Sequence, residues 1–312
     1  MIHYRRMLCG GLGLGFLLAL SIGCADQTLA PLDPGPGPQE PTDGIYIANA
    51  DGSNLRRLVG GERPAWSPDG RRIAFQWYAI IHVIGIDGSG DTWLGPGHDP
   101  AWAPDGTRLA FTSVEGISVM RDDGSEVTTL LRHDFREEID PKWDLGVAKP
   151  AWSPDGKRIA FVHLGAGDAL GGPAPGPPVY PQVFVMNADG SAPRRPTETQ
   201  GEVSELDPSW SPDGSEIVFW SSEYGIAAVP AAGGTPRTIY QNAPDLAYGA
   251  EPVWSPDGHS ILFTSHSYSL EGQAIWLVAQ EGGQPERLIE KGAHPDWSPD
   301  GASIVFWRIE PQ

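Results

Sequence analysis

The chain has 312 residues, of which 40 are acidic and 21 basic, and its formal net charge at pH 7 is −19. This excess of acidic residues argues against binding to nucleic acid, which needs a basic surface, and against electrostatic docking on anionic lipid. The two cysteines, Cys9 and Cys24, lie close to the N-terminus, so the rest of the chain contains no disulfide pair.

Residues 1–23 have the layout of an export signal peptide. Arg5 and Arg6 form a basic start, and an apolar segment follows that is short for a membrane-spanning helix. Cys24 comes directly after Ile-Gly and resembles the cysteine of a bacterial lipoprotein cleavage site, although Leu20 lies one position earlier than usual. We therefore expect export to the periplasm or outer surface, with a lipid anchor on Cys24. Plain secretion and an uncleaved anchor are the alternatives.

Residues 24–42 are predicted to be a tether. The segment is rich in proline and has few large apolar residues, so it cannot bury a core of its own. At about 3 Å per residue it could hold a folded domain up to roughly 50 Å from a membrane. The folded domain is predicted to comprise residues 43–312.

A twelve-residue pattern begins with Pro-x-Trp-[Ser/Ala]-Pro-Asp-Gly, continues with an alternating run that ends in phenylalanine, and occurs six times. Pro-Asp-Gly favours a tight turn, so each copy is typical of a β-hairpin. A nearly constant block with spacers of variable length indicates one supersecondary unit per repeat. The copies are residues 64–75, 100–111, 150–161, 208–219, 252–263 and 295–306.

A second hairpin follows each of the first five copies, and one more precedes the first copy. Each has four or five β-prone residues, a glycine-centred turn and a short polar strand. Two hairpins make the four antiparallel strands of a propeller blade, so we predict an all-β, six-bladed β-propeller. The second hairpins are residues 45–58, 81–94, 117–130, 183–196, 226–239 and 275–288.

The two ends of the domain are out of phase with the repeat. Residues 45–58 form a second hairpin with no first hairpin before it, and residues 295–307 form a first hairpin with no second one after it. Pairing these halves completes the sixth blade. Ring closure leaves no half-blade with an unpaired inner strand, whose exposed edge would invite aggregation.

The six Trp-[Ser/Ala]-Pro-Asp-Gly hairpins, combined with hairpins such as Val-Phe-Val-Met-Asn-Ala-Asp-Gly-Ser at 183–191, resemble the TolB-like β-propeller repeat. The resemblance covers residues 45–307 and implies the fold. The same repeat is also seen in the propellers of prolyl-oligopeptidase-type enzymes, so it is compatible with many functions. TolB itself has an additional α/β domain before its propeller, where this chain has the proline-rich segment.

The insertions between hairpins are expected to lie on one face of the ring. The Trp-Ser-Pro-Asp-Gly turns, on the opposite face, never vary in length. Long polar loops on one face of a rigid fold are where binding usually occurs, so we expect any function on this insertion face. The insertions are Leu131–Lys149, Val162–Gln182, Thr197–Asp207, Gln241–Glu251 and Thr264–Gln273.

The sequence contains none of the common catalytic motifs. It has no Gly-x-Ser-x-Gly elbow, no glycine-rich phosphate loop, no His-Glu-x-x-His and no cysteine-based metal site. We therefore assign no catalytic residue, metal ligand or cofactor.

One set of polar residues is a candidate binding site. Each lies directly before a repeat proline, at the start of an innermost strand on the insertion face, and should surround the mouth of the central channel. With His98 and an acidic segment at 133–140 these residues would form a polar funnel for a peptide segment, a sugar or a divalent cation. The alternative is a solvated rim whose charges pair with one another. The residues are Arg63, Asp99, Lys149, Asp207, Glu251 and His294.

These observations favour a protein-binding or scaffolding module of the bacterial cell envelope, acting through its insertion face on an unidentified envelope protein or peptide. It would contact the membrane only through its lipid anchor. An alternative is a propeller enzyme that acts on glycans, as a lyase or hydrolase, with the carboxylates and histidines of the channel mouth. A propeller with a purely structural role is a third possibility.

Overall fold

The computed structural model describes residues 43–132, 147–164, 180–199, 203–241, 251–265 and 272–309. The predicted signal peptide, Cys24 and the tether lie outside the described residues, as does most of every insertion except Thr197–Asp207. The described residues form strands and turns, and they include no helix long and apolar enough to cross a membrane.

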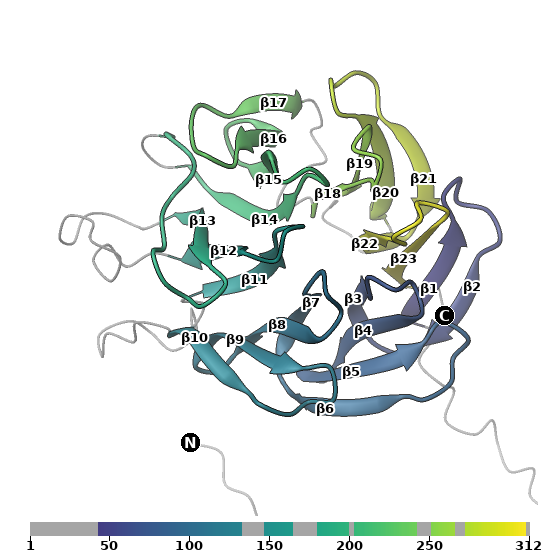
Figure 1. The fold of residues 1–312 in the computed structure, drawn as a ribbon. Helices are drawn as coiled ribbons and strands as arrows, with labels where there is room; N and C mark the ends of the chain where they lie inside the picture. The colour runs from purple at the N-terminus through teal and green to yellow at the C-terminus, as the bar shows by residue number, and fades with distance from the viewer. Residues whose placement is uncertain are drawn as a thin grey trace, which may run out of the picture. The chain divides into compact units, whose positions relative to one another are not determined.

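Six antiparallel sheets surround a central axis in residues 43–309, which confirms the predicted six-bladed propeller (Figure 1). The first blade has β3 (Glu62–Trp66), β4 (Arg72–Trp77), β5 (Ile80–Gly85) and β6 (Thr92–Pro96). The second has β7 (His98–Trp102), β8 (Arg108–Ser113), β9 (Gly116–Arg121) and β10 (Thr128–Arg132). The third has β11 (Val147–Trp152), β12 (Arg158–Leu164) and β13 (Pro181–Asn187).

The remaining three blades have four strands each. The fourth has β14 (Glu205–Trp210), β15 (Glu216–Ser221), β16 (Gly225–Pro230) and β17 (Arg237–Tyr240). The fifth has β18 (Val253–Trp254), β19 (Ser260–Ser265), β20 (Ala274–Ala279) and β21 (Glu286–Glu290). The sixth has β22 (Gly292–Trp297), β23 (Ser303–Arg308), β1 (Gly44–Asn49) and β2 (Arg56–Val59).

The sixth blade joins the two ends of the domain, as predicted. Its strand order is β2-β1-β23-β22, and Ile47 of β1 lies opposite Val305 of β23. Ile304, Val305 and Phe306 are completely buried. The C-terminal hairpin therefore supplies the two inner strands of the closing blade and part of its core.

The third blade departs from the predicted four strands. Its sheet has three, and the expected fourth is reduced to a single bridge between Val185 and Arg194. Pro193 and Pro196 stand on either side of this position. Because proline has no backbone N–H to donate to a ladder, the pairing stops after one bridge.

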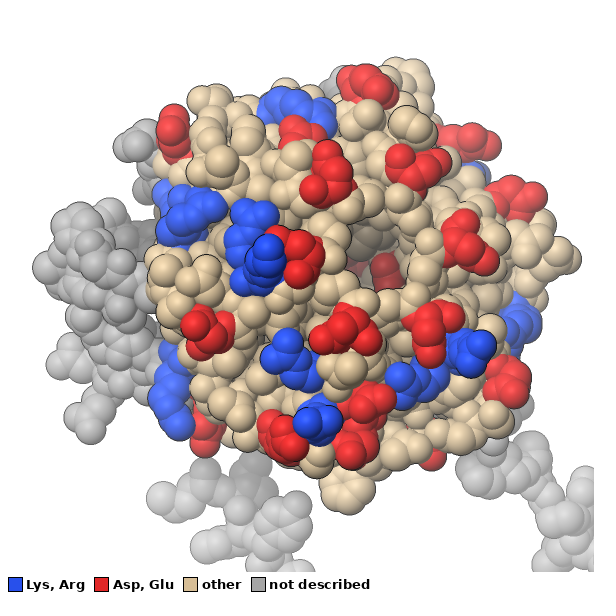
Figure 2. Space-filling view, in the orientation of Figure 1, with Lys and Arg blue, Asp and Glu red and all other residues tan. Residues whose placement is uncertain are grey.

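Five of the six repeat turns, all except that of the second blade, share one hydrogen-bonding pattern. In the third blade, Ser153 donates to Asp155 across 2.6 Å, and its hydroxyl accepts the backbone N–H of Arg158 at 2.9 Å. The turn glycine has a φ of 68°, in the left-handed region that favours glycine. The same bonds lower the pKa of the turn aspartates, that of Asp213 to about 2 through Ser211 and Ser215. Acidic side chains surround the channel opening on the face seen in Figure 2.

The repeat tryptophans pack between neighbouring blades. Trp66 of the first blade, for example, lies in one cluster with Ile45 and Ile47 of the sixth blade and with Phe75 of its own. Arginines from the preceding blade cover three of these rings, with the guanidinium carbon of Arg72 4.7 Å from the ring centre of Trp102. Burial of a large aromatic ring is worth about 4–6 kcal/mol before entropic costs. The interfaces between blades are therefore the hydrophobic core.

Candidate binding site at the channel mouth

The six residues that precede the repeat prolines all adopt the same unusual backbone conformation. Their φ values are Arg63 53°, Asp99 49°, Lys149 55°, Asp207 57°, Glu251 46° and His294 53°. In five of the six blades the ladder of the innermost strand shifts its register at this point. A non-glycine residue held there costs about 1–3 kcal/mol. Since all six blades share the conformation, it belongs to the repeat, and only the side chains distinguish the positions.

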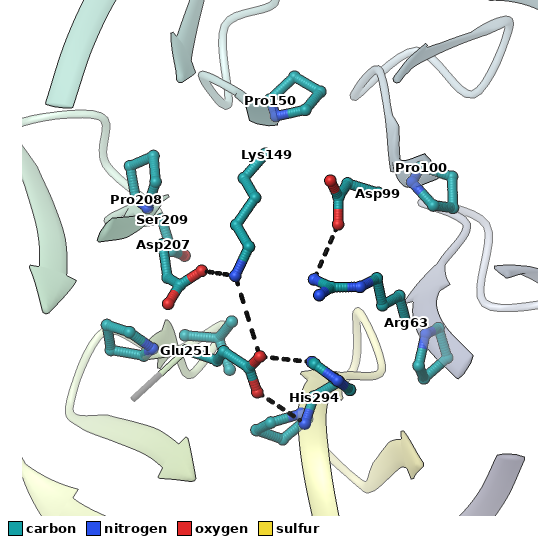
Figure 3. Close-up of a pocket in the computed structure, with 14 residues that line it drawn as sticks. Arg63, Asp99, Pro100, Lys149, Pro150, Asp207, Pro208, Ser209, Glu251 and His294 are labelled. Carbon is teal, nitrogen blue, oxygen red and sulfur yellow. Dashed lines mark hydrogen bonds and ion pairs between the residues drawn. The ribbon is translucent and has the colours of Figure 1, made fainter. Parts of the chain in front are cut away.

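This shared geometry brings the six side chains together around a single opening. They line a cavity of about 170 Å³ together with the prolines that follow them. Figure 3 shows Arg63 and Lys149 extending into the middle of this mouth, with the carboxylates of Asp99, Asp207 and Glu251 around them.

One ion-pair network connects four of the six blades. The ammonium of Lys149 binds a carboxylate oxygen of Asp207 and lies 4.0 Å from Glu251 (Figure 3). The other neighbour of Glu251 is His294, whose Nδ1 is 2.5 Å from Oε1 and whose backbone N–H donates to Oε2 at 3.0 Å. Thr264 also donates to Oε2, at 3.1 Å.

A second, separate pair occupies the other side of the mouth. A guanidinium nitrogen of Arg63 lies 2.8 Å from Oδ1 of Asp99. Thr112 donates to the second oxygen of Asp99 at 3.2 Å and accepts the backbone N–H of Lys149 at the same distance. The mouth is therefore held by contacts that run from blade to blade.

The ionisation of the mouth is determined by competition between burial and neighbouring charges. Burial opposes ionisation of Glu251, but His294, Lys149 and Arg63 hold its pKa well below the usual range. Burial likewise disfavours the charged form of Lys149, yet Asp207 and Glu251 raise its pKa above the ordinary value. Both groups are therefore charged at neutral pH.

His98 does not join these six residues. The side chain of His98 is exposed and lines a separate groove with Phe111 and Val114. Residues 133–140 lie outside the described residues. Within the described ranges, no group of three His, Cys, Asp or Glu side chains is placed to hold a metal ion.

Sequence reasoning missed a set of supporting residues on the second strands. Gln76 accepts the backbone N–H of Asp99 at 3.1 Å, and Thr112 and Thr264 make the bonds described above. Each directly follows the phenylalanine that ends its repeat. The other three copies have an apolar residue at this position, namely Val162, Trp220 and Trp307. This difference between the copies could have indicated the supporting residues from the sequence.

Asp296 was also missed, although it replaces the small or apolar residue that other copies have before the repeat tryptophan. Its carboxylate accepts the backbone N–H of Trp66 in the first blade at 2.8 Å and that of Trp297 at 2.9 Å. Burial raises the pKa of Asp296 to about 7, although the two hydrogen bonds act to lower it. The residue links the closing blade to the first blade, just below the mouth.

Solved structures with the same fold include proteins of different activities. A candidate TolB from Agrobacterium tumefaciens is 23% identical, with a TM-score of 0.68, and the alignment covers 87% of this chain and 99% of that one. TolB from Acinetobacter baumannii is 16% identical, with a TM-score of 0.60 and coverages of 86% and 66%. An oligogalacturonate lyase from Vibrio parahaemolyticus is 13% identical, with a TM-score of 0.53 and coverages of 82% and 80%.

At these identities the structural likeness shows the fold alone. No curated protein matches the chain significantly. The sequence of residues 117–311 matches the family described as the TolB beta propeller domain. Because this match spans more than half of the chain, and six blades built from its repeat are present, the protein belongs to the TolB beta propeller domain family.

Proposed function

We propose that this protein is an exported, lipid-anchored propeller that binds another protein of the bacterial cell envelope through its insertion face. One observation carries the proposal. Six blades present charged or titratable side chains of five kinds, from one shared backbone conformation, around a single opening. A repeat that served only to build the ring would have no need of this chemical variety at one position.

The size of the mouth favours part of a peptide as the ligand. Pockets for small molecules usually measure about 300–1,000 Å³. A cavity of about 170 Å³ admits the end of one side chain more readily than a sugar chain. The surrounding insertion loops would supply the rest of the contact area.

Affinity capture from a detergent-solubilised envelope extract tests the binding function. The full chain serves as bait, beside the double variant Asp207→Ala with Glu251→Ala. A matched control, Glu286→Ala with Glu290→Ala, removes the same charge from exposed positions on the outer strand β21. We expect one envelope protein to be captured by the parent and the control and lost with the mouth variant. Equal capture by all three baits would place the contact elsewhere.

The lipid anchor is a separate part of the proposal, since it depends on Cys24 alone. We expect Cys24→Ser to release the protein from the membrane fraction. Unchanged fractionation of this variant would contradict the anchor and leave the binding function untouched.

The alternative of a glycan-acting enzyme depends on the same carboxylates and on His294. It predicts turnover by the purified protein, which incubation with a panel of acidic and neutral oligosaccharides would reveal as new reducing ends or unsaturated products. Turnover abolished by Glu251→Gln would favour the enzyme over the binding module.

A further inference from the structure

We infer that the channel mouth accepts a cationic group from its ligand, the ammonium or guanidinium end of a lysine or arginine side chain, in exchange for its own Lys149. The inference rests on the proposed binding function and specifies the chemistry that the mouth would recognise. Three features of the mouth carry it.

The first is that the carboxylates are less exposed than the cations that cover them. Asp99, Asp207 and Glu251 face two permanent cations and His294, and the exposed fractions of the three acidic side chains are 15%, 6% and 12%. The two cations are more exposed, at 31% for Arg63 and 26% for Lys149. The acidic groups are therefore the fixed part of the mouth, and the basic side chains cover them from the solvent side.

The second feature is an oxygen atom of Asp207 that has no partner. Oδ1 binds Lys149, but Oδ2 is buried and accepts no hydrogen bond from any described residue. A buried carboxylate oxygen without a donor is costly, because it has lost its hydration. Asp99, at the equivalent position two blades away, has partners for both oxygens. Of these two aspartates, only Asp207 therefore has a buried oxygen that lacks a hydrogen-bond donor.

The third feature is the way Lys149 is held. Thr112 anchors its backbone N–H, while its ammonium is the only cation that contacts Asp207 among the described residues. The side chain can therefore leave without moving the strand. Removing the only cation from a buried carboxylate is strongly unfavourable unless another cation takes its place. A neutral or anionic ligand group could not make this replacement.

The test uses single amino acids with both ends capped, because they isolate the side chain. N-acetyl-lysine methylamide and its arginine counterpart are titrated into the full chain, with the norleucine and glutamate derivatives as neutral and anionic controls. Binding is measured by calorimetry on the parent and on Lys149→Ala, Asp207→Asn and Asp99→Asn. The melting temperature of each variant shows whether it is folded.

We expect the cationic probes to bind more tightly than norleucine, and Lys149→Ala to bind them at least tenfold more tightly than the parent, since the competing ammonium is gone. Asp207→Asn should weaken the cationic probes about tenfold, because a hydrogen bond to a charged group is lost. The matched change Asp99→Asn should have a smaller effect. Added probe should also restore melting temperature lost in Lys149→Ala.

Three results would overturn the inference: equal binding of the norleucine and lysine probes, no gain in Lys149→Ala, or equal losses in Asp207→Asn and Asp99→Asn. None of these would touch the proposed function, which depends on capture of an envelope protein by the parent and its loss with the mouth variant. Conversely, cation binding without any captured partner would leave the inference standing and remove the proposed function.

Discussion

The two ends of the innermost strand of each blade differ in their chemistry. At one end, the Trp-Ser-Pro-Asp-Gly turn repeats the same bonds, with a serine hydroxyl 2.6 Å from the turn aspartate in five of the six blades. At the other end, the backbone is equally uniform, but the side chains are one arginine, one lysine, one histidine and three carboxylates. Uniformity in backbone and side chain indicates a structural part, whereas a uniform backbone with variable side chains is what a binding surface needs.

The two ends also differ in where their bonds lead. The bonds of the turn stay within five residues of the chain, so each turn forms independently of the rest of the ring. The ion pairs of the mouth join residues 36 to 102 positions apart and require different blades to be in place. We therefore expect substitutions in the turns to reduce stability and substitutions at the mouth to reduce binding.

The largest expected effect comes from removing the inner hairpin of the closing blade. Deletion of residues 295–312 takes away β23 and half of β22, so β1 loses its partner strand and the ring stays open. We expect no cooperative thermal unfolding, measured by circular dichroism. A truncated protein that melted at the parent's temperature would show that the closing blade is not needed for the other five.

Asp296, in the innermost strand β22 of the closing blade, should make stability depend on pH. The pKa of Asp296 is raised to about 7, so its protonated form is favoured in the folded protein. Its contribution is fully present below the unfolded pKa near 3.8 and is lost as the pH rises through 7.

Between pH 5 and pH 8 the parent should lose up to about 3 kcal/mol of unfolding free energy from this group. Asp296→Asn has no titratable group at this position, so its free energy of unfolding should fall less between the two pH values. Urea unfolding of both proteins at the two pH values measures it, and parallel pH dependence of parent and variant would contradict the assignment.

A smaller effect is expected when the stability cost of a substitution in a turn is compared with that of one at the mouth. Ser153→Ala leaves the backbone N–H of Arg158 without its acceptor and should cost about 1–2 kcal/mol. Asp99→Asn removes a partly exposed ion pair and should cost less than about 1 kcal/mol. Chemical denaturation of both variants makes the comparison. If Asp99→Asn were the more destabilising change, the mouth would be a structural part of the ring.

The smallest effect uses the one turn that departs from the pattern. In the second blade, Ala103 stands where the other copies have serine, and Asp105 accepts its hydrogen bonds from Thr107 instead. Ala103→Ser supplies an acceptor for the backbone N–H of Arg108 and should stabilise the protein by about 0.5–1 kcal/mol. An unchanged or lower melting temperature would mean that Thr107 already compensates.

The sequence by itself determined the number of blades, the closure of the ring by residues 45–58 and 295–307, and which six residues stand at the mouth. These features follow from a repeat whose turns form through local contacts, so a one-dimensional pattern contains them. Tertiary structure decided which mouth residues pair, left one oxygen of Asp207 without a partner and turned His98 away. It also joined Asp296 to Trp66. Such contacts depend on side chains from different blades, separated by up to 230 residues, whose positions are set only when the ring closes.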